Sequence, residues 1–297
     1  MAALAPERPG RAAESGAAVV LAGGHEGGTA AGAVLTGRPL ADAVREALAA
    51  SPGPVCVVPM TLGRDPGLIA DCARALRWLG RDQGPGRLAL APPFATVDHL
   101  TAWLRTAAGK AVREAPDSSA VLVTAPAAGP FEDADLFRVA RLVRQYGHRR
   151  WVEVAFDGGD PGLAEGAERC RRLGASQVGL VRAAFCAPAE VPAGVLDTGP
   201  LLSRAAIEQV VRSRVQEALH RLADGRDGIA EGLDAEHGHG YAHSHGPGGD
   251  HGHGPDHGHG PDHGPDEGHD HGHDDDHSHG PTHDHAPRGH THGRPHH

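Results

Sequence analysis

The sequence predicts an α/β protein with two similar halves, each a parallel sheet in a three-layer arrangement, followed by a disordered tail. Short apolar runs of strand length alternate with amphipathic stretches of helix length, and the alternation restarts near residue 118. Strands that alternate with helices at this spacing favour right-handed βαβ units and a parallel sheet. The restart favours two halves of similar construction.

The first half, residues 17–115, begins with an apolar run that ends in a glycine-rich loop. Leu40, Val44 and Leu48 recur four residues apart after Pro39, which is typical of an amphipathic helix that starts at a proline. Similar patterns predict strands over 17–22, 55–62 and 87–91 and helices over 39–49, 68–79 and 97–112.

The second half, residues 118–223, repeats this order of elements. Apolar runs predict strands over 120–123, 151–156, 176–183 and 194–197, and helical periodicity predicts helices over 132–146, 162–173 and 203–222. Residues 88–93 and residues 194–200 each form a short run that ends in proline and precedes a helix. This correspondence between the halves favours an internal duplication.

Composition limits the class of protein. Residues 1–16 form a polar lead that we expect to be disordered, and they lack the apolar segment of a secretion signal. No later window holds the run of about 18 apolar residues that a membrane span needs. The four cysteines form no C-x-x-C pair and are expected to be reduced thiols. We therefore expect a cytoplasmic protein without membrane contacts.

The negative charge is concentrated at the C-terminal end. Residues 237–297 carry ten acidic residues against two arginines, a net charge of −8 out of −10 for the chain. The remainder is almost neutral, and binding to nucleic acid is not expected.

Residues 224–297 are predicted to be a disordered, metal-binding tail. Residues 237–297 contain 20 of the 24 histidines, and apart from Tyr241 they have no aromatic residue and no Val, Ile, Leu, Phe or Met. Such a segment cannot bury enough apolar surface to offset the entropy of ordering. Neutral imidazole is the commonest metal ligand, and the intervening glycines let neighbouring rings turn toward one ion.

The predicted tail ligands alternate with glycine and acidic residues. They are His237, His239, His243, His245, His251, His253, His257, His259, His263, His269, His271, His273, His277, His279, His283 and His285. Imidazole binds several divalent metals, so Co, Ni, Zn and Fe all stay open as the ion bound.

Several segments carry a likeness to a known family. In the second half they are residues 151–156, 160–166, 173–175, 178–181 and 199–202, and in the first half His25, 57–59 and 91–93. With these segments the chain resembles the sirohydrochlorin cobaltochelatase family, the small chelatases of cobalamin and sirohaem biosynthesis. The first half is an abbreviated version, shorter between its first strand and Val55.

The resemblance implies two α/β halves that face a cleft, with metal insertion carried by histidines on loops that follow the strands. His25 matches the first such position, whereas the second position of that half falls at 63–65 and contains no histidine. In the second half the equivalent positions fall at 124–126 and 184–186, again without histidine. The resemblance therefore implies His25 as a catalytic residue and metal ligand.

Other polar residues are expected near His25. Asp65, Asp157 and Cys186 follow predicted strands, where open α/β sheets form their ligand sites, and a mixed N/O/S set suits a borderline metal. Asp65 is predicted as a second catalytic residue, although an aspartate before a proline is also a common helix cap. Cys186 is alternatively a small buried apolar residue.

Two arginines are predicted to bind the substrate. Arg64 and Arg182 lie at predicted strand ends, and a guanidinium group binds carboxylates of an acidic tetrapyrrole in bidentate fashion.

Two functions follow as expectations. The first is a chelatase that inserts Co²⁺, or else Ni²⁺ or Fe²⁺, into sirohydrochlorin or a related tetrapyrrole, with the tail as a metal reservoir. The alternative is a catalytically impaired homologue that binds, stores or delivers metal without turnover. Expected partners are the tetrapyrrole, divalent ions, and a metal transporter or other enzymes of the pathway. A GTP-dependent metallochaperone is excluded because the chain contains no G-x-x-x-x-G-K-[ST] motif.

Overall fold

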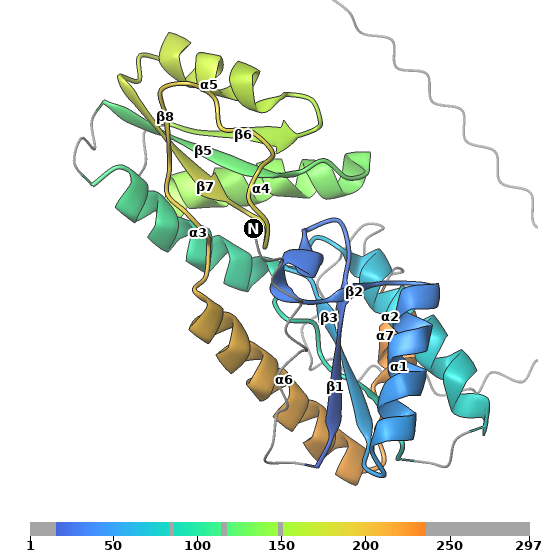
Figure 1. Cartoon of the computed structure of the whole chain (residues 1–297). Helices are drawn as coiled ribbons and strands as arrows, with labels where there is room; N and C mark the ends of the chain where they lie inside the picture. The colour runs from blue at the N-terminus through green and yellow to red at the C-terminus, as the bar shows by residue number, and fades with distance from the viewer. Residues whose placement is uncertain (1–15, 83–85, 114–117, 148–150, 236–297) are drawn as a thin grey trace, which may run out of the picture. The chain divides into compact units, whose positions relative to one another are not determined.

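Two four-stranded parallel sheets form the framework of the protein (Figure 1). The computed structural model describes residues 16–82, 86–113, 118–147 and 151–235. The strand orders are β2-β1-β3-β4 and β6-β5-β7-β8, and every pairing within them is parallel. The predicted α/β class with two similar parallel-sheet halves is confirmed.

The first sheet is built from short, strongly apolar strands. They are β1 (Ala18–Gly23), β2 (Val34–Leu35), β3 (Val55–Met60) and β4 (Leu88–Leu90). Helices α1 (Arg38–Ala50) and α2 (Pro66–Leu79) cover one face, where Leu40, Val44 and Leu76 are fully buried. All six residues of β3 are buried, because both faces of this central strand are covered.

The second sheet repeats this plan. Its strands are β5 (Ser119–Pro126), β6 (Val152–Asp157), β7 (Gln177–Arg182) and β8 (Val195–Asp197). Helix α5 (Leu163–Arg172) covers one face, with Ala167 and Cys170 packed on Ala120 and Leu122. Helix α4 (Pro130–Tyr146) lies on the other face and buries Leu136, Val139 and Val143.

Each half covers part of the other half's sheet with its last long helix. Helix α3 (Val97–Ala111) follows β4 in the chain but packs on α4 and β7, and α6 (Arg204–Ala223) follows β8 but packs on β3 and β4 (Figure 1). One apolar cluster therefore runs through both halves and includes Met60, Leu104, Val181 and Val215. Phe94 and Phe185 also meet across the halves in an edge-to-face contact, with ring centroids 5.2 Å apart.

The register of the two central strands identifies equivalent positions in the halves. Gly23, the last residue of β1, pairs with Met60, and Thr124 of β5 pairs with Arg182 in the same way. Counting on from these pairs, His25 corresponds to Pro126 and Asp65 to Ala187. The two halves thus share a backbone plan but differ in the side chains at the carboxyl ends of their strands.

Four short elements were not predicted from the sequence. They are β2, the 3₁₀ helices η1 (Gly28–Ala31) and η2 (Gly80–Asp82), and α7 (Ile229–Leu233). None of these segments is long enough to show a periodicity. Helix α7 falls within the stretch from residue 224 that was predicted to be disordered, yet it packs on α2, where Gly232 lies against Ala73. Within the described ranges no helix is both long and apolar enough to cross a membrane.

The shared apolar cluster predicts that both halves unfold together. Replacing Leu104, which is fully buried on α3, by alanine is expected to lower the free energy of unfolding by about 2–5 kcal/mol in a single transition. The matched control is Leu196→Ala, because Leu196 is 65% exposed and its truncation should change stability by less than about 0.5 kcal/mol. Urea unfolding followed by circular dichroism measures both values, and two separate transitions would contradict the shared core.

Candidate functional site

His25 and Asp65 meet at the carboxyl edge of the first sheet. His25 lies two residues after β1, and Asp65 is the N-cap of α2, where its Oδ1 accepts a hydrogen bond from the N–H of Leu68 at 2.9 Å. The second oxygen, Oδ2, lies 3.1 Å from His25 Nδ1 and accepts the backbone N–H of His25 at 3.3 Å. Asp65 therefore caps the helix with one oxygen and holds His25 with the other.

This contact fixes the chemical state of the imidazole. Because Nδ1 faces a carboxylate, it carries the proton, and the lone pair of the neutral ring lies on Nε2. Nε2 is buried and has no hydrogen-bond partner among the described residues, although 22% of the His25 side chain is exposed. A carboxylate on one ring nitrogen and a vacant lone pair on the other is the arrangement found in metal-ligating histidines.

The two partners shift each other's pKa. Burial alone lowers the pKa of His25, but the hydrogen bond and charge of Asp65, with a contribution from Glu26, outweigh burial and raise it above 6.5. Burial raises the pKa of Asp65, yet the hydrogen bond and charge of His25 bring it below 3.8. Both shifts favour the His25⁺–Asp65⁻ pair in the absence of another ligand.

Gly24 makes room for this contact. A Cβ atom at position 24 would lie 2.0 Å from Asp65 Oδ2, so that any other residue would push the carboxylate away from His25. Position 24 of the glycine-rich loop after β1 therefore needs glycine on steric grounds, so that Asp65 can reach His25.

The next residue, Glu26, is buried among polar partners of the loop that follows β3. Its Oε2 accepts hydrogen bonds from the Thr61 hydroxyl and from the N–H of Leu62, the latter at 2.8 Å. Its Oε1 lies 3.5 Å from Nε of Arg64, whose side chain is completely buried. Burial raises the pKa of the Glu26 carboxyl above 4.5, although Arg64 and Thr61 act in the opposite direction.

Thr61 organises the 61–65 loop. Its hydroxyl oxygen accepts the backbone N–H of Gly63 at 2.9 Å and that of Asp65 at 3.2 Å, while its proton goes to Glu26. This hydroxyl is fully used and fixes the backbone from which Asp65 reaches His25.

Arg64 has different partners from those predicted for substrate binding. Its Nη1 donates to the backbone oxygen of Glu132, in the first turn of α4, at 2.9 Å. A guanidinium group with no exposed surface cannot reach a substrate in this conformation. The side chain instead connects the first half to the second.

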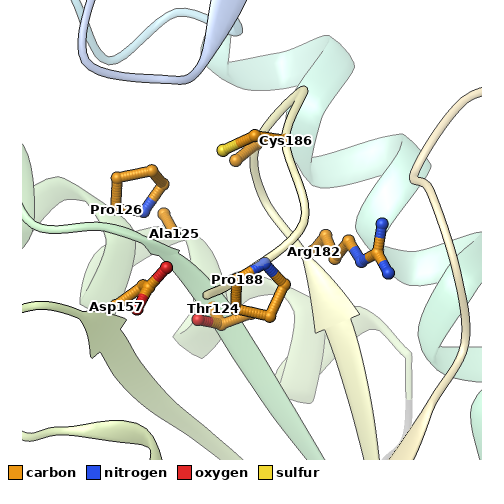
Figure 2. A pocket seen from close by; sticks show the side chains of 8 residues that line it. Thr124, Ala125, Pro126, Asp157, Arg182, Cys186 and Pro188 are labelled. Carbon is orange, nitrogen blue, oxygen red and sulfur yellow. The ribbon is translucent and has the colours of Figure 1, made fainter. Parts of the chain in front are cut away.

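Equivalent strand ends of the second half line a small hollow of about 180 Å³ (Figure 2). Thr124, Asp157 and Cys186 face it from the ends of β5, β6 and the loop after β7, whereas the Arg182 guanidinium points away from it (Figure 2). This guanidinium forms an ion pair with Asp197. Asp157 Oδ2 accepts the N–H of Ala189 at 2.7 Å, and the buried Thr124 hydroxyl has no partner among the described residues. Arg182 is therefore held by an ion pair within its own half.

Cys186 touches the loop that contains His25. Gly27 has a φ of +78°, and a Cβ there would lie 2.5 Å from Cys186 Sγ. The neighbouring Phe185 donates its N–H to the Glu26 carbonyl at 2.9 Å. Burial is the main reason that the pKa of the Cys186 thiol is raised, which favours the neutral thiol.

A second hollow of about 230 Å³ is lined mainly by apolar side chains, including Leu62, Phe185 and Leu201. Each hollow has room for about one water molecule once the open solvent at its mouth is left out. Neither could enclose a tetrapyrrole without movement of the loops around it.

The structure thus brings His25, Asp65, Glu26 and Arg64 together and places Asp157, Arg182 and Cys186 around a separate hollow. Within the described part of the chain, no group of three or more His, Cys, Asp or Glu side chains is arranged to hold a metal ion. The predicted tail ligands lie outside the described residues. Sequence reasoning missed Thr61, whose only sequence signal is a hydroxyl residue between a buried strand and Gly63-Arg64-Asp65-Pro66.

Comparison with known proteins gives little further information. No model of a protein family matches the chain, and no curated protein sequence matches it. Among solved structures, it is similar to a multi-domain protein of Deinococcus radiodurans that is described as structurally similar to chelatases, with two additional novel domains. The alignment has 20% identity and a TM-score of 0.34, and it covers 77% of this chain and 56% of the other. The chain therefore spans little more than half of that protein, and a likeness at this level shows neither family nor activity.

The His25–Asp65 pair predicts a pH-dependent contribution to stability. Because the folded-state pKa of His25 is raised, this contribution is full below 6.5 and is lost as pH rises through the folded-state pKa. The contribution of Asp65, whose pKa is lowered, is present above 3.8 and is lost as pH falls. His25→Gln should therefore lower the free energy of unfolding by about 1 kcal/mol more at about pH 5.5 than at about pH 9, and urea unfolding measures both values.

The control for this comparison is His220→Gln, because His220 is exposed on α6 and should contribute little at either pH. The tail is identical in all three proteins, so its titration cancels in the differences. An equal cost of His25→Gln at both pH values would contradict the pairing.

Proposed function

We propose that the protein is a metal chelatase of the sirohydrochlorin cobaltochelatase kind, which passes Co²⁺, or else Ni²⁺ or Fe²⁺, to an acidic tetrapyrrole at His25. The observation that carries the proposal is the His25–Asp65 pair, in which Nδ1 is held 3.1 Å from the carboxylate and Nε2 has no partner among the described residues. A neighbouring carboxylate orients the ring and makes Nε2 a better donor to a metal ion. The metal is the cargo of this reaction.

The same pair supports the proton chemistry of insertion. Metal insertion releases two pyrrole protons, and the imidazole becomes a free base when the ion leaves Nε2. The pKa of His25 is raised by Asp65, so that the vacated ring is well suited to take one of these protons. The second proton leaves to water. His25 would thus deliver the ion and then act as a base.

The tail is the proposed reservoir. The described residues end shortly after α7, and α7 packs on α2, the helix that Asp65 caps. A Cβ atom at Gly232 of α7 would lie 3.7 Å from the carbonyl oxygen of Ile69 in the first turns of α2. If residues 237–297 form a flexible coil, as their composition predicts, their end-to-end distance is roughly 40–45 Å. Tethered ligands also keep metal at a high local concentration.

Turnover tests the enzymatic proposal directly. With Co²⁺ and sirohydrochlorin under anaerobic conditions, the absorbance change of metal insertion should exceed the uncatalysed rate. His25→Ala should lower the rate by about 100-fold, and Asp65→Asn by about 10- to 100-fold. His220→Ala, on the exposed face of α6, serves as the control and should retain the full rate.

Metal bound without any turnover above the uncatalysed rate would reject the chelatase proposal and favour the alternative, a protein that stores or delivers metal. The lack of a second dyad, with Pro126 and Ala187 at the equivalent positions, is the feature that favours this alternative.

The tail makes a separate prediction. A chain that ends at residue 236 should lose most of the Co²⁺ or Ni²⁺ equivalents bound by the full chain, because 20 of the 24 histidines are removed. Binding to the full chain should weaken below about pH 6, since protonated imidazole cannot coordinate a metal. Equilibrium dialysis measures both effects, and circular dichroism checks that the shortened chain is folded. Undiminished binding by the shortened chain would contradict a role of the tail.

A further inference from the structure

The His25–Asp65 contact is one of two parallel links between the same two loops. His25 and Glu26 are neighbours after β1, and Arg64 and Asp65 are neighbours after β3. The first link, His25 to Asp65, has a length of 3.1 Å and is partly exposed, whereas Glu26 and Arg64 lie 3.5 Å apart with side chains that are 1% and 0% exposed. Two adjacent links prevent either loop from rotating past the other.

The buried link also joins the two halves. Arg64 Nη1 donates to the backbone oxygen of Glu132 at the start of α4, and the carbonyl of Glu26 accepts the N–H of Phe185 from the loop after β7. Both bonds are 2.9 Å long and connect the first half to the second. The residues next to the dyad are therefore the ones attached to the opposite half.

The link is not fully satisfied in this conformation. Glu26 Oε1, Arg64 Nε and Arg64 Nη2 are buried without hydrogen-bond partners among the described residues, and so is His25 Nε2. Buried polar atoms without partners cost free energy, which water would recover on exposure. Local opening of this part of the contact between the halves therefore costs less free energy than opening of the apolar cluster behind it.

We propose that Glu26 and Arg64 are positioning residues that control access to His25 Nε2. While Arg64 Nη1 donates to the backbone oxygen of Glu132, with Glu26 beside the guanidinium, the loops stay closed and Nε2 is covered. When the Arg64–Glu132 bond breaks, the His25–Asp65 dyad stays intact and Nε2 becomes accessible to a metal-bearing ligand. This inference rests on the proposed role of His25, but its test requires neither metal nor tetrapyrrole.

The test is the rate at which diethyl pyrocarbonate modifies His25 in the full chain, resolved by mass spectrometry of peptides. The exposed His220 in the same molecule is the internal reference. The key variant is the double substitution Glu26→Gln with Arg64→Met, which leaves no uncompensated charge in the interior and is therefore expected to fold. The amide introduced at position 26 can still accept hydrogen bonds from Thr61 and Leu62, whereas the thioether introduced at position 64 has no N–H to donate to Glu132.

We expect the rate of His25 modification, relative to that of His220, to rise about tenfold. This is the size expected from losing one charge-assisted hydrogen bond that keeps the loops closed. The pH midpoint of the His25 reaction should stay near its wild-type position, because Asp65 is unchanged and the double substitution removes the opposing effects of Glu26 and Arg64 on the pKa of His25 together. A general loss of structure would instead raise the rate of modification and also move the pH midpoint of the His25 reaction, because the contact with Asp65 would be lost. The matched control, Glu165→Gln with Arg169→Met, removes an exposed pair on α5 and should leave His25 unaffected.

An unchanged His25 rate in the folded double variant would overturn the inference, as would an equal rise in the α5 control. If the double variant does not fold, the variant Arg64→Lys is tested instead. Lysine keeps the charge beside Glu26 but is too short to reach Glu132 as well, so that His25 should again react faster with diethyl pyrocarbonate. An unchanged rate in folded Arg64→Lys would also overturn the inference. Absence of chelatase turnover would reject the proposed function but would leave this result standing.

Discussion

The apolar cluster that runs through both halves is the constraint on which the rest of the structure depends. Helix α3 leaves the first sheet to cover the second, and α6 returns to cover the first. Without α6 the first sheet would have only the face covered by α1 and α2 buried, and without α3 the second sheet would lose the cover over β7. The loops that carry His25, Asp65 and Phe185 therefore meet because the core holds the strand ends of the two halves beside each other.

At this meeting point, polar side chains replace apolar packing. Asp65 serves two purposes with its two oxygens, since the helix cap and the histidine contact each use one. Glu26 and Arg64 carry a larger cost because both are removed from water and are only partly compensated. Replacing such a buried pair by well-packed apolar residues is often neutral or stabilising, so stability alone does not account for Glu26 and Arg64.

Much of the fold could be predicted because most helices and strands show their own periodicity. The apolar residues of α1 and α6 recur every three or four positions, and the central strands are continuous apolar runs. The two-residue strand β2 and the five-residue α7 are too short for such a signal, and they form because the first sheet and α2 offer them a surface. The exchange of α3 and α6 between the sheets leaves no trace in local sequence.

The candidate site was predictable only in part, for the same reason. His25 was expected from the family resemblance and Asp65 as a polar residue after a predicted strand, and the structure pairs them. The burial of Arg64 and Glu26 depends on α4 and on the loop after β7, which are far away in sequence, so that an arginine expected to face a substrate instead faces a carboxylate. Such pairings follow from tertiary contacts and cannot be read from spacing.

The repeated plan of the two halves has a consequence for which positions of the chain tolerate substitution. Because both halves contribute to a single core, each must keep its strands and helices, but only one needs to keep a particular set of side chains at its strand ends. The second half has Pro126 and Ala187 where the first has His25 and Asp65, and it retains the same strand order. The repeated backbone plan therefore places no demand on the side chains at the strand ends, and the two halves can differ in chemistry there without a change of fold.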